Sequence, residues 1–227
     1  MGKMITEIRD RKIDTILVDF DGTVMDTNEL ILNSWLYAIK KFTGRDASVD
    51  EIESTFGEVI KHTMARLVPN VGIEESLKAY REYQVDNYLK TIHPFEGVKE
   101  TLETLRNEGF HVAMVTSRMP KSTKDGLEHY GLYDYFETII TPDSCPEFKP
   151  HPRPILLAME ELGSVAEHTI MVGDTKHDME AANAAGVVAV LVDYSIALPP
   201  GKRDGVSPDY IIDKFSDILT LVGIGKN

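Results

Sequence analysis

Two carboxylates that lie two positions apart, Asp19 and Asp21, directly follow a short apolar run, residues 16–18. Along an extended backbone, residues two positions apart point to the same side, so both acids can serve one site. Gly22 comes next and allows a sharp turn that brings backbone N–H groups close to a bound anion. One carboxylate could attack a phosphorus atom while the other protonates the leaving oxygen. Such a pair needs a cation, because its own charge would otherwise repel a phosphate.

The same stretch has a purely structural interpretation, because Asp-Gly between apolar runs is a strong signal for a β-hairpin. The apolar run after the turn, Val24-Met25, is short for a returning strand. Asp26, with Glu29 three residues later, is typical of the N-terminal cap of a helix that begins near Asn28. The sequence therefore favours a strand, a turn and a helix, and the hairpin stays open as the second interpretation.

Composition limits the classes of partner. The chain has 227 residues, of which 42% are hydrophobic, and a formal net charge of -13. This length suits one sizeable core with an appended subdomain. The negative charge, without a basic stripe, argues against nucleic acid or a membrane surface as a partner. A small anionic substrate would then be met by local positive charge and a metal rather than by the field of the whole protein. We expect the protein to be a monomer or a homodimer.

The single cysteine, Cys145, excludes an internal disulfide and suits a reducing compartment. The N-terminal residues contain no apolar segment of the length that export requires, and nowhere do eighteen apolar residues run together. We therefore expect a cytoplasmic protein.

Two patterns of secondary structure follow the paired acids. Residues 28–92 carry apolar positions at helical spacing, which predicts helices near residues 30–42, 49–56, 59–68 and 73–89. From residue 93 onward, helices near 97–108, 121–130, 152–163 and 177–185 alternate with β-branched strands near 111–117, 136–141, 169–173 and 187–193, before a last strand near 210–213 and a terminal helix. This alternation predicts a parallel sheet covered by helices on both faces.

Further polar residues stand at the predicted carboxyl ends of the strands, where such sheets bind their ligands. Thr116 and Ser117 precede a helix and could bind an anion at its N-terminus, or simply cap it. Lys149 lies in a proline-rich loop that is stiff enough to hold its side chain in place. Asp174 stands at a strand tip and Asp178 one helical turn later, a spacing that suits one hard cation held directly and through water.

Together these residues resemble the four motifs of the haloacid dehalogenase superfamily of phosphohydrolases, and the resemblance covers nearly the whole chain. The motifs are Asp19-Phe20-Asp21-Gly22-Thr23, Thr116-Ser117, Lys149-Pro150 and Gly173-Asp174-Thr175-Lys176-His177-Asp178. The resemblance implies an α/β fold: a Rossmann-like parallel sheet core formed by residues 1–24 and 94–227, with an inserted small helical cap domain of the C1 type at residues 25–93.

The resemblance also implies roles for single residues. Asp19 would be the nucleophile that forms an aspartyl-phosphate, and Asp21 would be the general acid and then the general base. The phosphate would be bound at Thr116, Lys149, Ser117, Asp21 and Gly22. The cofactor would be Mg²⁺, bound by Asp19, the backbone carbonyl of Asp21 and Asp174, with Asp178 in its outer shell. Lys61 and His62 of the insert are candidates for gripping a second anionic group, although they are more typical of solvated surface.

Within the superfamily, Asp21 argues for phosphoryl transfer, because dehalogenases and phosphonate-cleaving relatives lack this acid. Residues 26–31 and 207–210 are most similar to the phosphoglycolate phosphatase and cytoplasmic pyrophosphatase branch. We therefore expect Mg²⁺-dependent hydrolysis of a small phosphomonoester, such as phosphoglycolate, or of pyrophosphate. Arg118 is a departure, since relatives frequently have small or amide residues there.

Three alternatives remain open. One is a sugar-phosphate mutase of the same superfamily, although mutases typically carry an acid where this chain has Gly173. Another is a receiver-type phospho-accepting signalling module, which also gathers acids, a hydroxyl and a lysine at strand ends. The third is a homologue that has lost catalysis and binds a partner through its insert.

Overall fold

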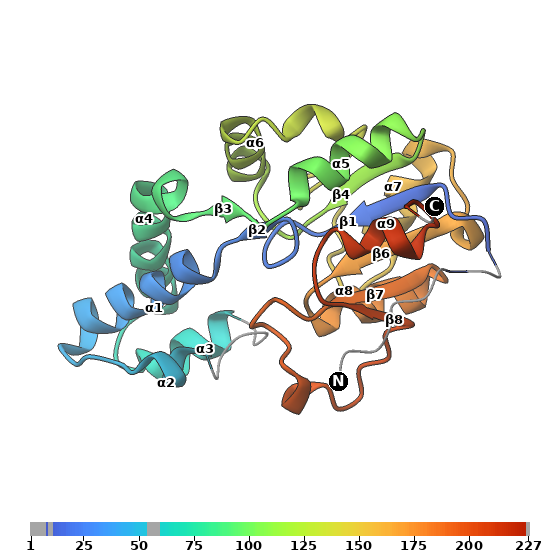
Figure 1. Cartoon of the computed structure of the whole chain (residues 1–227). Helices are drawn as coiled ribbons and strands as arrows, with labels where there is room; N and C mark the ends of the chain where they lie inside the picture. The colour runs from blue at the N-terminus through green and yellow to red at the C-terminus, as the bar shows by residue number, and fades with distance from the viewer. Residues whose placement is uncertain (1–7, 9–10, 54–59, 226–227) are drawn as a thin grey trace. The chain divides into compact units, whose positions relative to one another are not determined.

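The computed structural model (Figure 1) describes residue 8 and residues 11–53 and 60–225. The chain divides into two compact units. Unit 1 comprises the residues up to Met25 and those from Pro94 onward, and unit 2 is Asp26–His93. The strands β2 (Met25–Asp26) and β3 (His93–Pro94), where the chain leaves and re-enters unit 1, pair as a two-stranded sheet.

Unit 1 is built on a six-stranded sheet with the order β5-β4-β1-β6-β7-β8. All of its pairings are parallel. Its strands are β1 (Thr15–Val18), β4 (His111–Val115), β5 (Thr138–Ile140), β6 (Thr169–Gly173), β7 (Val188–Val192) and β8 (Tyr210–Ile212). The predicted α/β class is therefore confirmed.

The strand that leads into the paired acids, β1, lies between β4 and β6 and is parallel to both. The hairpin interpretation is therefore wrong, because the neighbours of β1 come from far along the chain. Strands β4 and β5 are shorter than predicted. The 3₁₀ helix η1 (Tyr133–Tyr135) ends just before Phe136, so β5 begins only at Thr138, and the chain after Val115 turns away as a loop.

Helices cover both faces of the sheet. On one face, α7 (Arg153–Leu162) and α8 (Lys176–Ala185) pack against the strands in a cluster that includes Leu17, Met171 and Ile155. Alternate strand residues such as Ile16 and Ile170 are also fully buried, which shows that the other face is covered too. Helices α5 (Val98–Asn107) and α9 (Asp217–Leu221) contact each other there, in front of the sheet in Figure 1.

The remaining elements of unit 1 are short or lie beside the sheet. They are α6 (Pro120–His129) and the 3₁₀ helices η2 (Ala166–His168) and η3 (Pro200–Lys202). Within the residues that the structure describes, no helix is both long and apolar enough to cross a membrane.

Unit 2 is helical, with α1 (Asn28–Thr43), α2 (Val49–Glu53), α3 (Ile60–Leu67) and α4 (Ile73–Thr91). Its core contains Trp35 and Tyr80, whose ring centroids lie 5.0 Å apart. Residues 54–59, where we expected the second helix to end and the third to begin, lie outside the described residues.

The start of α1 differs in detail from the expectation. Thr27 holds the N-cap position without a side-chain hydrogen bond to the helix. The carboxylate of Asp26 instead accepts a hydrogen bond from the backbone N–H of Asn28 at 3.0 Å. The acid thus caps the helix from one position further out. Lys61 and His62, on α3, are exposed, and their suggested role stays a prediction.

Candidate active site

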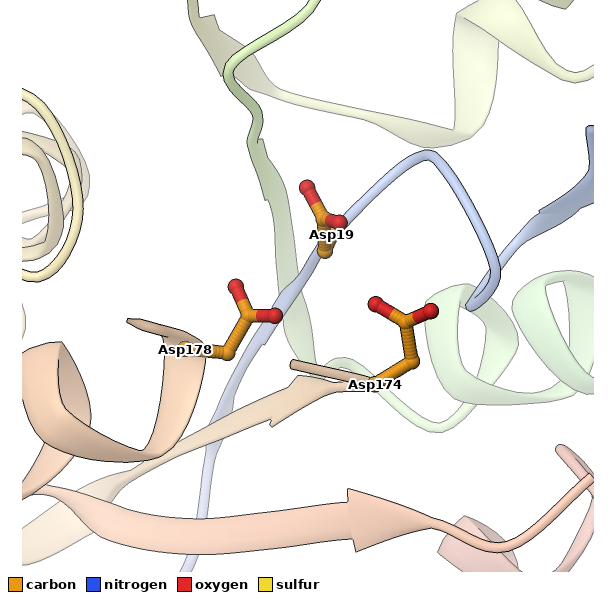
Figure 2. Close-up of side chains that lie close together, drawn as sticks. All are labelled: Asp19, Asp174 and Asp178. Atoms are coloured by element: carbon orange, nitrogen blue, oxygen red, sulfur yellow. The ribbon is translucent and has the colours of Figure 1, made fainter. Parts of the chain in front are cut away.

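The acids predicted to form the site meet at the carboxyl ends of two neighbouring strands (Figure 2). Asp19 follows β1, Asp174 follows β6, and Asp178 lies in the first turn of α8. Val18 of β1 is in register with Val172 of β6, so the two chains leave the sheet at the same level. The three residues each offer an oxygen, and these oxygens all lie within 4.8 Å of one another.

Lys149 pairs with two of the three acids of this cluster, Asp19 and Asp178. Its Nζ donates hydrogen bonds to Oδ1 of Asp19 at 2.8 Å, to Oδ1 of Asp178 at 2.6 Å and to the backbone carbonyl of Val115 at 2.8 Å. These three bonds use all three donors of an ammonium group. The Lys149 side chain is only 5% exposed, so water screens these ion pairs weakly.

Local hydrogen bonds at the start of α8 fix the position of Asp178. It is the third residue of α8 and forms a capping box with Thr175: Thr175 Oγ1 accepts from the Asp178 backbone N–H, and Asp178 Oδ2 accepts from the Thr175 backbone N–H at 3.0 Å. Its other oxygen accepts from Lys149. Protein donors therefore occupy both oxygens, which suits a positioning role in the outer shell of a metal.

Asp174 is arranged differently. Ser195, just after β7, donates a hydrogen bond of 2.6 Å to its Oδ2. Oδ1 of Asp174 is buried and has no hydrogen-bond partner among the described residues. A buried carboxylate oxygen without a partner is costly, and a hard cation is a ligand that satisfies it.

Two glycines make room for this arrangement. A Cβ on Gly22, whose φ is +69°, would lie 1.9 Å from Asp174 Oδ2. A Cβ on Gly173 would lie 2.4 Å from Asp178 Cβ. The two glycines thus leave the space that the acids occupy. Because Asp19 and Asp174 each bring a carboxylate oxygen to the cluster, and Oδ1 of Asp174 has no other partner among the described residues, these residues fit a divalent metal that both could ligate directly.

Electrostatics within the cluster are strongly perturbed. Burial raises the pKa of Asp19 to about 7, helped by the charges of Asp178 and Asp21 and opposed by Lys149. Burial and the charges of Asp178 and Asp19 also raise the pKa of Asp174 well above its usual value. Burial alone would lower the pKa of Lys149, but the two carboxylates outweigh it and hold this pKa above its usual value. Acids with raised pKa values around a buried lysine are typical of a functional site.

The second acid of the pair, Asp21, faces a different partner. Both of its carboxylate oxygens accept hydrogen bonds from the guanidinium of Arg118, in the loop after β4. Thr116 at the end of β4 accepts a hydrogen bond from the Arg118 backbone N–H at 3.1 Å. The Thr116 side chain thus stabilises the backbone of the loop that carries Arg118.

The hydroxyls of Thr116 and Ser117 do not cap α6. The N-cap residue of that helix is Met119, and it makes no side-chain cap bond. Ser117 is exposed. No hydrogen bond from its side chain to the acids is present among the described residues, so its phosphate-binding role stays a prediction.

Two contributors were missed by the sequence reasoning. One is Ser195, which orients Asp174. The other is Tyr194, whose hydroxyl donates to the Thr23 carbonyl at 2.7 Å and whose ring packs on Phe95 with centroids 4.6 Å apart. Both lie within three residues of the end of β7, so the rule that ligand sites lie at the carboxyl ends of strands could have indicated them.

Comparisons with known proteins agree with this geometry. Residues 16–192 match the family model of haloacid dehalogenase-like hydrolases. The chain is 36% identical over 214 residues to pyrophosphatase PpaX of Halalkalibacterium halodurans, covering 94% of this chain and 98% of that protein. It is 30% identical over 213 residues to pyrophosphatase PpaX of Bacillus mycoides, covering 93% and 97%.

Solved structures with the same fold include a protein of Haemophilus somnus described as a predicted phosphoglycolate phosphatase. Its TM-score is 0.80 at 25% identity, covering 92% of this chain and 98% of that chain. A haloacid dehalogenase-like hydrolase of Streptococcus pneumoniae has a TM-score of 0.80 at 24% identity, covering 92% and 97%.

The receiver-type alternative does not fit these relatives. The fold, the family match and the full-length similarity to curated enzymes all lead to one assignment. The chain belongs to the haloacid dehalogenase-like hydrolase family and is an enzyme of its phosphatase branch.

Proposed function

We propose that this enzyme is a Mg²⁺-dependent, cytoplasmic phosphatase that hydrolyses pyrophosphate or a small phosphomonoester such as phosphoglycolate through an aspartyl-phosphate. The observation that carries the proposal is the buried group of Asp19, Asp174 and Asp178, with Lys149 paired to Asp19 and Asp178 and with Asp21 two residues from the nucleophile. The 36% identity to a pyrophosphatase over nearly the whole chain supports the substrate class.

In the first step, a carboxylate oxygen of Asp19 attacks phosphorus, and the bond from phosphorus to the leaving oxygen breaks. The leaving oxygen takes the electron pair of that bond and the proton of Asp21. Lys149, already 2.8 Å from Asp19, offsets the negative charge of the carboxylate and of the phosphoryl group it approaches. The product is an aspartyl-phosphate and a free leaving group.

In the second step, water attacks the phosphorus of the aspartyl-phosphate and gives a proton to Asp21, which now acts as a base. The bond between phosphorus and the Asp19 oxygen breaks, phosphate leaves, and both acids return to their starting states. One water is consumed in each turnover.

Asp19 and Asp174 would hold the Mg²⁺ directly, together with the backbone carbonyl of Asp21, and Asp178 would orient Lys149 beside them. When bound, the cation neutralises the negative charge that the acids and the phosphate bring together. The buried, unpartnered Oδ1 of Asp174 supports this assignment. Thr116 and backbone N–H groups of the turn after β1 are the proposed contacts to the phosphoryl oxygens. The N–H of Gly22 itself is not among them, because it donates to the Met25 carbonyl at 2.9 Å.

The mutase alternative has less support. Mutases of this superfamily typically carry an acid at the position of Gly173, but any Cβ there would lie 2.4 Å from Asp178 Cβ. An acid at this position would therefore displace the residue that holds Lys149.

The direct test is turnover of p-nitrophenyl phosphate with Mg²⁺ and with a chelator. We expect activity only with the metal, and a loss of at least about 10⁴-fold in Asp19→Asn, since the nucleophile is gone. The matched control is Asp143→Asn, which changes an exposed acid that does not belong to the cluster and should keep full activity. Wild-type activity in Asp19→Asn would refute the mechanism.

A screen of phosphorylated metabolites, ranked by kcat/KM, tests the substrate class. Pyrophosphate or phosphoglycolate should rank among the best substrates. If both rank among the worst, the assignment to this branch is wrong although the phosphatase chemistry stands.

A further inference from the structure

Arg118 grips the proposed general acid. Its Nε lies 3.1 Å from Oδ1 and 3.0 Å from Oδ2 of Asp21, and its Nη2 lies 2.5 Å from Oδ1. The Arg118 side chain is 10% exposed, and that of Asp21 is 31% exposed. The guanidinium carbon lies 5.2 Å from the centroid of the Phe20 ring, which is fully buried. The guanidinium is therefore held in a fixed position beside Asp21.

The ion pair between Arg118 and Asp21 conflicts with the proposed role of Asp21 in proton transfer. Both carboxylate oxygens of Asp21 face N–H groups of Arg118, so neither is fully free to carry a proton to the leaving oxygen or to take one from water. In each turnover the ion pair must open at least in part. A second anion that competes for the guanidinium would open it.

The position of Arg118 indicates which part of the substrate provides that anion. A general acid contacts the leaving oxygen, so the groups that surround Asp21 lie on the leaving-group side of the reacting phosphorus. Lys149 cannot bind an anion on the leaving group, because its three donors are engaged by Asp19, Asp178 and the Val115 carbonyl. The planar guanidinium has five N–H donors and binds phosphate or carboxylate through two parallel hydrogen bonds.

We propose that Arg118 recognises a negatively charged leaving group and, by exchanging Asp21 for that anion, releases Asp21 for proton transfer. The inference rests on the proposed function and specifies its substrate class: a leaving group that carries phosphate or carboxylate. A substrate whose leaving group is neutral leaves the pair of Arg118 and Asp21 closed.

Paired substrates test this proposal. Pyrophosphate and phosphoglycolate have anionic leaving groups, whereas ethyl phosphate and 2-hydroxyethyl phosphate have neutral ones. Phosphoglycolate and the two neutral esters have alcohol leaving groups of similar size that all require a proton, so the general acid is needed in each case. In Arg118→Met we expect kcat/KM to fall about 100-fold for the anionic pair. For the neutral pair it should not fall.

Two further variants make the result interpretable. Arg118→Lys keeps the charge but loses the planar fork, so it should recover part of the activity on the anionic pair. Arg106→Met is the matched control, since Arg106 forms a comparable ion pair with Glu137. Glu137 directly precedes β5 and so lies at the amino ends of the strands, whereas Arg118 and Asp21 follow the carboxyl ends. It should leave the ratio of kcat/KM between the two pairs of substrates unchanged.

The outcomes separate this inference from the proposed function. If Arg118→Met lowers kcat/KM equally for all four substrates, Arg118 only holds Asp21 in place and the inference is wrong, while the phosphatase assignment stands. If the wild type hydrolyses none of the four substrates, the proposed function fails. The inference about Arg118 is then tested by measuring ligand binding.

Calorimetry of Asp19→Asn with Mg²⁺ present provides that binding measurement. Adding Arg118→Met to this variant should weaken pyrophosphate binding at least about 10-fold, because a charged, bidentate contact is lost. Binding of inorganic phosphate should change less than about twofold, since one phosphate fills only the site at Asp19. Equal weakening of both ligands, in a variant whose circular dichroism spectrum is unchanged, would overturn the inference.

Discussion

Lys149 Nζ lies 2.8 Å from Oδ1 of Asp19, and the two side chains are only 5% and 9% exposed. The same ammonium group lies 2.6 Å from Asp178. One buried cation thus stands between the proposed nucleophile and the acid that caps α8. Stability and the readiness of Asp19 to react therefore depend on the same lysine.

Replacing Lys149 with Met should damage both properties. The carboxylates of Asp19 and Asp178 would stay buried without their counter-charge, so we expect the free energy of unfolding to fall by about 3–5 kcal/mol. We expect kcat to fall at least about 100-fold, because charge on the phosphoryl group is no longer offset. Urea unfolding and steady-state kinetics measure the two effects.

The matched control for this prediction is Lys176→Met. Lys176 is 50% exposed and lies 3.6 Å from Glu180 on the surface of α8. Exposed ion pairs contribute little to stability, so this variant should keep both the urea midpoint and the rate. A Lys149→Met protein as stable as the control would contradict the role of the buried ion pairs.

Gly22→Ala should inactivate the enzyme by displacing Asp174. The new Cβ would lie 1.9 Å from Asp174 Oδ2 and 2.8 Å from Ser195 Oγ. Gly97→Ala is the control, because Gly97 has a similar φ of +76° but its nearest contact would be Ser216 Cβ at 3.7 Å. Both variants should lose about 1 kcal/mol from the left-handed backbone, and only Gly22→Ala should lose at least about 100-fold in kcat. Equal kcat in the two variants would show that the contact with Asp174 does not matter.

Ser195→Ala should weaken Mg²⁺ binding. The Ser195 hydroxyl donates to Oδ2 of Asp174 at 2.6 Å, which fixes the carboxylate and partly opposes the rise in its pKa that burial causes. Without it, Asp174 is less well oriented and is protonated more readily, so we expect the Kd for Mg²⁺ to rise about 10-fold. Calorimetric titration measures this constant, with the exposed Ser207→Ala as the control. An unchanged Kd in Ser195→Ala would remove Ser195 from the metal site.

The metal-free enzyme should lose stability as the pH rises toward neutral. The pKa of Asp19 is about 7 in the folded protein against an ordinary value of 3.8, and the pKa of Asp174 is raised as well. Between these pH values the folded state binds more protons than the unfolded state, so the free energy of unfolding falls as the pH increases. Thermal unfolding in EDTA should therefore show a Tm that decreases from about pH 5 to about pH 7.5.

Mg²⁺ should reverse this trend, since metal binding favours the deprotonated carboxylates. The rise in Tm on adding Mg²⁺ should be larger at the higher pH. Asp174→Asn should flatten the slope in EDTA, whereas Asp143→Asn, at an exposed position, should keep it. A slope that is the same in Asp174→Asn and the wild type would show that this carboxyl is not its source.

The sequence alone was sufficient for the fold class and for the order of the longer helices and of the six strands of the main sheet, but not for the short strands β2 and β3. Strand β6 has the predicted bounds, Thr169–Gly173, because a run of β-branched and apolar residues between turn signals is a local property. The same holds for Gly44, which ends α1 with a φ of 71°. Local sequence also named the residues that could do chemistry, since an acid at the end of a buried strand is unusual wherever it occurs.

Only the tertiary structure decided which of these residues act on one another. Lys149 and Asp19 are 130 positions apart, and Arg118 and Asp21 are 97 positions apart. Their contacts depend on the parallel register that aligns the ends of β4, β1 and β6. Neither periodicity nor propensity encodes this register, because it results from packing strands distant in sequence into one sheet. For the same reason, the grip of Arg118 on Asp21 and the support of Asp174 by Ser195 became visible only in the folded chain.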